Sequence, residues 1–180
     1  MIEDEGGDPA CWAHLFEDDE DAATDARPTV VGIHVAPASR LPMRSVESVT
    51  AEAGAGLVGD RYHGTRHRHV TIQSRAGLDE ATASLGTPVD PALTRRNLTI
   101  SHGEIPTAPG SRIQVGDVAL EVVRVAAPCK LLDDTIGPGA RDALRRRGGS
   151  VCRLLSSGTI SVGDEVALDA AGLDSKPAMG

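Results

Sequence analysis

The sequence predicts a mostly β fold, a β-barrel with two or three short peripheral helices. From residue 28 onward, short segments rich in Val, Ile, Leu and Thr alternate with Gly and Pro, as is typical of strands joined by turns. Helical periodicity occurs in only two or three brief segments, which argues against a parallel βαβ sheet. Tyr62 is the sole aromatic residue after residue 28, so aliphatic side chains must build the core.

Each expected strand is a short run of alternating or continuously apolar residues. The strands are predicted at residues 29–35, 45–50, 69–73, 97–101, 112–115, 118–125, 152–155 and 165–168. Gly-Asp pairs at residues 59–60, 116–117 and 163–164 predict tight turns between them, because both residue types favour turn conformations. The three aspartates are therefore interpreted as turn formers and not as general acids.

Three segments have helical features. Residues 75–85 place Leu78, Ala81 and Leu85 on one face, and Ser74 is a candidate N-cap. Residues 91–95 predict a single turn after a proline. Residues 138–147 begin with proline and end in three arginines followed by Gly148 and Gly149, an order typical of a helix with cations at its C-terminus.

The charge is concentrated at the start of the chain. The formal net charge is −8, and residues 1–27 hold ten of the 26 acidic residues and one basic residue, Arg27. Such blocks of like charge are typical of solvated tails. We therefore expect an acidic leader at residues 1–27, whose apolar residues include Trp12 and Phe16, a folded domain at residues 28–170 and a flexible tail at residues 171–180.

Several functional classes are disfavoured by composition. No apolar stretch is long enough to span a bilayer, and no signal peptide is recognisable. Cys11, Cys129 and Cys152 have unrelated spacings, which favours a reducing cytoplasm over a disulfide framework. Base-stacking aromatic residues are nearly absent, so no nucleic acid is expected as a partner. Phosphate loops, Ser-His-Asp patterns and paired carboxylates are not recognisable either.

Cys129 is the strongest candidate for chemistry. It follows a proline and precedes Lys130, the only lysine of the expected domain. A thiolate can act as a nucleophile, a sulfur carrier or a soft metal ligand, and a neighbouring cation favours that ionised form. Arg61, Arg95 and Arg96 are candidates for gathering at the same mouth of the barrel, together with Arg66 and Arg68.

Four stretches resemble the MOSC family, named for the C-terminal domain of molybdenum-cofactor sulfurases. They are Gly-Leu-Val-Gly-Asp-Arg-Tyr-His-Gly at residues 56–64, Arg-Arg-Asn-Leu-Thr-Ile-Ser at 95–101, the run from 110 to 129 ending in Pro-Cys, and the glycines at 148–149 followed by Gly-Thr-Ile-Ser-Val-Gly-Asp at 158–164. Their order and spacing together are more specific than any one of them. The resemblance runs from about residue 30 to residue 168 and implies a MOSC-like β-barrel.

The resemblance also implies a function. Cys129 matches the cysteine thought to bind the molybdenum of a pterin cofactor or to carry sulfane sulfur as a persulfide. Arg95, Arg96 and Asn97 match a stretch that contacts the cofactor, and guanidinium and amide groups suit a phosphate and a pterin. Sulfur-transfer or molybdenum-dependent activity is expected, with a cysteine desulfurase or a molybdoenzyme as partner and no pyridoxal phosphate in this chain.

Other interpretations remain open from the sequence. The domain could be a non-catalytic adaptor that docks a partner enzyme through the leader, or a component of a system that reduces N-hydroxylated compounds. Cys152 is interpreted as core packing, with a resolving role for Cys129 as the alternative. His63, His67 and His69 are close enough in sequence to suggest a zinc site, although their spacing fits neither one helix face nor one strand face.

Overall fold

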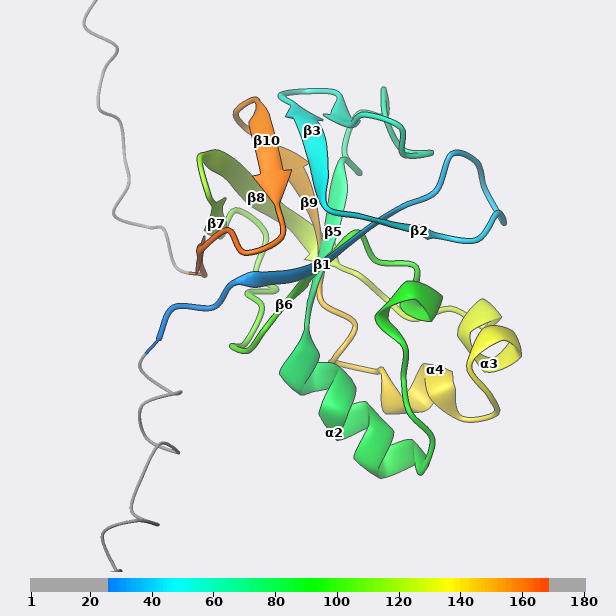
Figure 1. Ribbon diagram of the computed structural model, residues 1–180. Helices are drawn as coiled ribbons and strands as arrows, with labels where there is room; N and C mark the ends of the chain where they lie inside the picture. Colours follow the sequence, from blue (N-terminus) through cyan, green and yellow to red (C-terminus); the bar gives the residue numbers. More distant parts are fainter. Residues whose placement is uncertain (1–25, 169–180) are drawn as a thin grey trace, which may run out of the picture.

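The computed structural model describes residues 26–168, which form two sheets and a group of short helices (Figure 1). The larger sheet has eight strands in the order β11-β7-β8-β9-β5-β6-β1-β2, and the smaller has the order β10-β3-β4. The larger sheet curls into a half-barrel, and the mostly β fold is thereby confirmed. Its strands are β1 (Val30–Val35), β2 (Arg44–Val46), β5 (Val70–Ser74), β6 (Leu98–Ile100), β7 (Arg112–Val115), β8 (Val118–Val125), β9 (Ser150–Leu154) and β11 (Val166–Ala167).

The smaller sheet comprises β3 (Ser48–Glu52), β4 (Gly56–Leu57) and β10 (Gly158–Ser161). Strand β3 alternates between buried and exposed residues, so that one of its faces packs inward. The predicted strand at residues 45–50 is in fact divided between β2 and β3, which belong to different sheets. This division lets the chain pass from one sheet to the other.

One pair of strands is parallel among the described residues, namely β5 and β6. A parallel pair requires a crossover connection, which is supplied here by helix α2 (Arg75–Leu85) and the 3₁₀ turn η3 (Pro91–Thr94). The bounds of α2 agree with the prediction. The fold therefore contains one βαβ unit within an otherwise antiparallel arrangement.

Two apolar clusters stabilise the domain. The first lies between the sheets, and Ile33, Ile72 and Leu120 are among its fully buried members. The second joins Leu78 of α2 to Leu132 of α3 (Leu131–Thr135) and Ala140 of α4 (Ala140–Ala143). In Figure 1 these three helices lie together on one side of the larger sheet.

The C-terminal helical region departs from the prediction. The expected helix at residues 138–147 is helical only at Ala140–Ala143, because Gly139 precedes it with a φ of 89° and Arg146 adopts a φ of 69°. Helix α3 and strands β4 and β10 were not expected. Strand β10 was missed because Gly158 and the two hydroxyl residues in Gly-Thr-Ile-Ser weaken its apolar pattern.

The leader and tail lie almost wholly outside the described residues, so their expected roles are untested. No helix in the described part of the chain is long and apolar enough to cross a membrane.

Candidate functional site

A cavity of about 240 Å³ lies where the loop after β1, the loop after β4, the end of η3 and the loop before α3 meet. Five arginines and one cysteine contribute to its wall, and none of its lining residues is acidic. Its charged and nucleophilic lining residues are Arg40, Arg61, Arg68, Arg95, Arg96 and Cys129. Such a concentration of positive charge in a concave surface favours an anionic ligand.

Cys129 is solvent-exposed at this cavity and forms no disulfide within residues 26–168. Its backbone carbonyl accepts a hydrogen bond from the amide of Leu132 at 3.0 Å, which ties the cysteine to the start of α3. Lys130 occupies the N-cap position of α3 and is exposed, but it does not line the cavity. The cations that surround Cys129 in the cavity are therefore arginines.

Arg96 is 6% exposed and holds two loops together beneath the cavity. Its Nε donates to the carbonyl of Gly148 at 2.9 Å, and its Nη2 donates to the carbonyls of Ala126 at 2.7 Å and Ala127 at 3.3 Å. Burial lowers the pKa of Arg96 to about 10, and repulsion from Arg68 adds to the effect. The guanidinium stays charged at neutral pH, and its Nη1 has no hydrogen-bond partner among the described residues.

Arg95 and Arg61 form the next part of the wall. Arg95 follows η3 in the left-handed conformation, with a φ of 61°, and donates from Nη1 to the carbonyl of Leu41 at 2.9 Å. Arg61 pairs with Asp60 at 3.8 Å and contacts the sulfur of Met43 at 3.1 Å. Its side chain is only 5% exposed, so this ion pair is shielded from water and orients the guanidinium.

Arg68 and Tyr62 form a stacked pair in the cavity wall. The Arg68 guanidinium carbon lies 3.9 Å from the centroid of the Tyr62 ring, and that of Arg61 lies 4.5 Å from it. Burial lowers the pKa of Arg68, whereas Tyr62 opposes this shift. The Arg68 Nε is buried without a hydrogen-bond partner among the described residues. A buried donor without a partner is costly, so an anion at this atom would remove a penalty.

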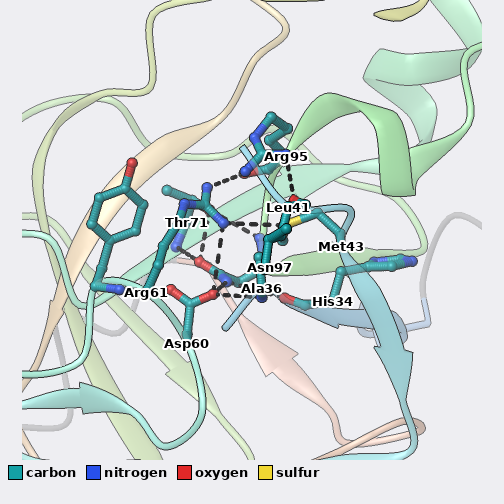
Figure 2. A network of polar contacts seen from close by, with 10 residues as sticks. His34, Ala36, Leu41, Met43, Asp60, Arg61, Thr71, Arg95 and Asn97 are labelled. Carbon is teal, nitrogen blue, oxygen red and sulfur yellow. Dashed lines mark hydrogen bonds and ion pairs between the residues drawn. The ribbon is translucent and has the colours of Figure 1, made fainter. Parts of the chain in front are cut away.

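Asn97 lies beside the site but does not line the cavity. Its Nδ2 donates to the carbonyl of His34 at 3.0 Å and to Asp60 Oδ1 at 3.1 Å, and its Oδ1 accepts from the amide and hydroxyl of Thr71 (Figure 2). These four bonds use the usual hydrogen-bonding capacity of its amide. Asn97 thus connects β1, β5 and the turn that carries Arg61.

Asp60 was expected only to form a turn, but its carboxylate also accepts hydrogen bonds from several neighbouring segments. Its Oδ1 also accepts from the amide of Ala36 at 3.1 Å (Figure 2). Its Oδ2 accepts from the amide of Tyr62 at 3.2 Å. The Asp60 side chain is fully buried, and its hydrogen bonds fix the loops that carry Ala36 and Tyr62. The Gly-Asp signal correctly placed the turn but did not reveal this network.

The three histidines do not converge. His69 donates from Nε2 to the carbonyl of Thr65 at 2.9 Å and accepts at Nδ1 from the amide of Leu154 at 2.9 Å. Burial lowers the pKa of His69. His63 contacts Glu52 at 2.7 Å, whereas His67 is exposed. Across residues 26–168, no group of three or more His, Cys, Asp or Glu side chains is arranged to hold a metal.

Cys152 belongs to the core between the sheets and is fully buried. Burial raises the pKa of its thiol to about 12. It pairs in register with Val70 and Val122, and it does not line the cavity of Cys129. The structure therefore supports core packing over a resolving role.

A family model described as the MOSC domain matches residues 59–167, more than half of the chain. The chain belongs to the MOSC family. No curated protein sequence matches it significantly.

Solved MOSC-like structures agree with the fold. The YUAD protein of Bacillus subtilis has a TM-score of 0.68 at 18% identity, and the match covers 78% of this chain and 94% of that one. YiiM of Geobacillus stearothermophilus has a TM-score of 0.61 at 16% identity, with coverage of 82% and 77%. YiiM of Escherichia coli has a TM-score of 0.59 at 17% identity, with coverage of 79% and 69%. At these identities the likeness shows the fold alone.

The MOSC pattern identified part of the cavity wall and missed another part. The arginines expected at one mouth with Cys129 were Arg61, Arg66, Arg68, Arg95 and Arg96, and all of them except Arg66 line the cavity together with Cys129. The pattern did not predict Arg40, Ser39, Tyr62 or Thr94. Arg40 has no pattern signal, because it lies in an irregular loop with a φ of 67°, although the prolines at residues 37 and 42 mark that loop.

Proposed function

We propose that this MOSC protein binds an anionic molybdopterin-type ligand in the arginine-lined cavity, with Cys129 as the sulfur group that meets it. The observation that carries the proposal is the meeting of five guanidinium groups and one exposed thiol in a single concave site without an acidic lining residue. Guanidinium groups bind phosphate through paired hydrogen bonds, and a thiolate is a suitable ligand for a soft metal.

The free donors fit such a ligand. Among residues 26–168, neither the buried Arg68 Nε nor Arg96 Nη1 has a hydrogen-bond partner, so both can donate to an anion. Arg61 and Arg95 are fixed by Asp60 and Leu41, which limits the reorganisation on binding. The cavity is smaller than the usual range of about 300–1,000 Å³, which suits an anionic end of a ligand whose remainder lies at the mouth.

Different residues of the site would bind the ligand and position the thiol. Arg68 and Arg96 neutralise the anionic end of the ligand, and Tyr62 supports Arg68 by stacking. The loop that carries Cys129 is held by Arg96 and by the start of α3, so the thiol is kept at the mouth. A bound molybdenum cofactor would supply oxygen-atom or sulfur chemistry at its metal.

A second candidate, sulfur carriage, is favoured by the exposure of Cys129, because a sulfur donor must reach the thiol. The Cys129 thiolate would attack the terminal sulfur of a donor persulfide. One S–S bond forms on Cys129, the donor S–S bond breaks, and the donor leaves as a thiolate, so no external oxidant or reductant is required. The expected partners are a cysteine desulfurase and an acceptor molybdoenzyme in the cytoplasm.

Expression in a bacterial host that makes molybdenum cofactor tests the proposal. Molybdenum is measured by mass spectrometry of the purified protein, and pterin by fluorescence after oxidative extraction. We expect both in the wild type and in the control Arg141→Gln, an exposed arginine of α4, and about tenfold less in Arg68→Gln because a charge-assisted contact is lost.

The Cys129→Ser variant separates the two candidates. Loss of molybdenum with retention of pterin supports metal ligation by the thiol. For sulfur carriage, the wild type is incubated with a desulfurase and cysteine. A gain of one sulfur atom on its Cys129 peptide, with no gain on the matching peptide of Cys129→Ser, supports this candidate. If the wild type holds neither molybdenum nor pterin and gains no sulfur, the proposal is wrong.

A further inference from the structure

We infer a second binding site, for the oxyanion group of a small ligand, at the N-terminal end of α2. A cavity of about 340 Å³ lies there, between the first turn of α2, the loop after β6 and the loop between α4 and β9. None of its lining residues lines the cavity of Cys129. The inference does not rest on the proposed function, because it concerns different donors.

Ser74 provides the first observation. It occupies the N-cap position of α2 and lines the cavity, yet its hydroxyl makes no capping bond. The residue is 6% exposed, and its Oγ is buried without a hydrogen-bond partner among the described residues. A buried hydroxyl without a partner costs free energy, which a ligand oxygen at this position would recover.

The helix end provides the second observation. Helix α2 has 11 residues and no acidic residue in its first turn, so no carboxylate there compensates the positive end of its dipole. The amides of Ala76 and Gly77 belong to the first turn and have no acceptor within the helix. Both residues line the cavity. Amide donors at a positive helix end are suited to an oxyanion.

Arg146 adds a positive charge at the same cavity. It makes no ion pair with any described residue, whereas its neighbour Arg147 donates from Nε to Glu80 at 2.9 Å. Arg146 also has a φ of 69°, a conformation that side-chain-bearing residues rarely adopt. A guanidinium group without an ion-pair partner among the described residues therefore lines the same cavity as Ser74, whose hydroxyl is unpartnered.

Glu104 limits the class of ligand. It lines the cavity and has no ion pair among residues 26–168. The wall carries two carboxylates, Glu80 and Glu104, and two guanidinium groups, those of Arg146 and Arg147, so its formal charges balance. A polyanion would be repelled by Glu104, whereas a single phosphate or carboxylate group could use the helix end and Arg146. The site therefore suits a small ligand with one oxyanion group and a neutral or cationic remainder.

Titration of the isotope-labelled full chain with inorganic phosphate, followed by amide NMR, tests the inference. Acetate and glycine titrations distinguish phosphate from carboxylate ligands, and sodium chloride at equal ionic strength is the reference. We expect saturable shifts at the amides of Ser74, Ala76 and Gly77 with at least one of the three ligands. Shifts confined to the cavity of Cys129, or no larger than those in chloride, would overturn the inference.

Two variants sharpen the result. Arg146→Gln is expected to weaken binding about tenfold, and Arg141→Gln, an exposed arginine of the same region, is expected to leave it unchanged. Ser74→Ala is expected to weaken binding without lowering the melting temperature of the ligand-free chain, because the hydroxyl has no partner there. A capping role would instead lower that temperature. Equal affinity of Arg146→Gln and Arg141→Gln would refute the assignment.

Discussion

The Arg96 guanidinium donates to the carbonyl oxygen of Ala126 at 2.7 Å, so a buried cation holds the chain three residues before Cys129. The same side chain donates from Nε to the carbonyl oxygen of Gly148 at 2.9 Å. Arg96 is therefore a positioning residue for the cysteine loop as well as a charge in the cavity wall. These carbonyl contacts compensate for the burial of the Arg96 cation.

Replacement of Arg96 by glutamine should lower the free energy of unfolding by about 2–4 kcal/mol, because three carbonyl acceptors lose a charged donor. Urea denaturation of the purified variant measures the change. Arg141→Gln is the control, and an exposed substitution of this kind should stay within about 0.5 kcal/mol of the wild type. A similar, small change in both variants would contradict the positioning role.

The two cysteines of the described domain should differ in reactivity. In a Cys11→Ser background, iodoacetamide should modify Cys129 in the native protein and leave Cys152 unmodified, because burial raises the Cys152 pKa to about 12 and shields its sulfur. Peptide mass spectrometry over a time course measures both rates.

Unfolding in guanidinium chloride provides the control for this experiment, since both thiols should then react at similar rates. Rapid modification of Cys152 in the native state would show that the core opens or that the thiol is accessible. It would then restore Cys152 as a candidate resolving partner for Cys129.

Asn97 should behave as a structural residue. Asn97→Ala removes four hydrogen bonds and leaves the His34 carbonyl, Asp60 and Thr71 with unpaired groups, so we expect a loss of about 2–4 kcal/mol in unfolding free energy. Thr71→Val removes the hydroxyl that donates to Asn97 Oδ1 and accepts from the Asn97 amide, and should cost about 1–2 kcal/mol. Thermal and urea unfolding test the ranking. Weaker ligand binding by Asn97→Ala at unchanged stability would instead indicate a direct contact.

Strands and helices with a clear apolar periodicity of their own were predicted correctly from the sequence. Strand β8 and helix α2 have the expected bounds, because an apolar alternation and an apolar helix face are visible in each segment alone. The division between β2 and β3 was not predictable, since it depends on which sheet each half joins. Helix α4 starts later and ends earlier than expected, because Gly139 before it and Arg146 after it adopt left-handed backbone conformations that no periodicity reports.

For the site, the sequence predicted which arginines lie near Cys129 but did not predict what each side chain contacts. Arg61, Arg95 and Arg96 were expected to gather near Cys129, and they line one cavity. The resemblance grouped Asn97 with Arg95 and Arg96, because all three match the stretch whose polar groups contact the cofactor in the family. Arg95 and Arg96 both line the cavity, whereas the Asn97 side chain bonds within the internal network. These residues lie between η3 and strand β6, and Arg95 is in the left-handed conformation, so no strand or helix periodicity predicts which side chains face the cavity.

Acidification should destabilise the domain through His69. Burial lowers its folded pKa below the unfolded value near 6.5, with His67 and Arg153 adding repulsion and the Thr65 carbonyl opposing the shift. The unfolded chain therefore binds more protons just below pH 6.5, and the stability contributed by neutral His69 is lost as the pH falls through that window.

Urea midpoints measured between pH 5 and pH 7.5 test this effect. We expect His69→Gln to be less stable at pH 7.5 and to lose less stability than the wild type on acidification. His34, whose pKa is also lowered by burial while Asp90 opposes the shift, should contribute a similar slope in both proteins. Parallel slopes for the wild type and His69→Gln would contradict the assignment.

Replacement of Gly149, in the loop between α4 and β9, should lower the free energy of unfolding strongly. Its φ is 75°, and a Cβ would approach the carbonyl oxygen of Ile72 within the van der Waals limit. Gly86 has a similar φ of 72° but open space around it, so Gly86→Ala isolates the cost of the backbone conformation, about 1–2 kcal/mol. We expect Gly149→Ala to cost at least about 2 kcal/mol more, because backbone atoms of β5 must move. Comparison of the two variants by urea unfolding tests this difference, and equal losses would mean that the loop before β9 can shift away from Ile72 without cost.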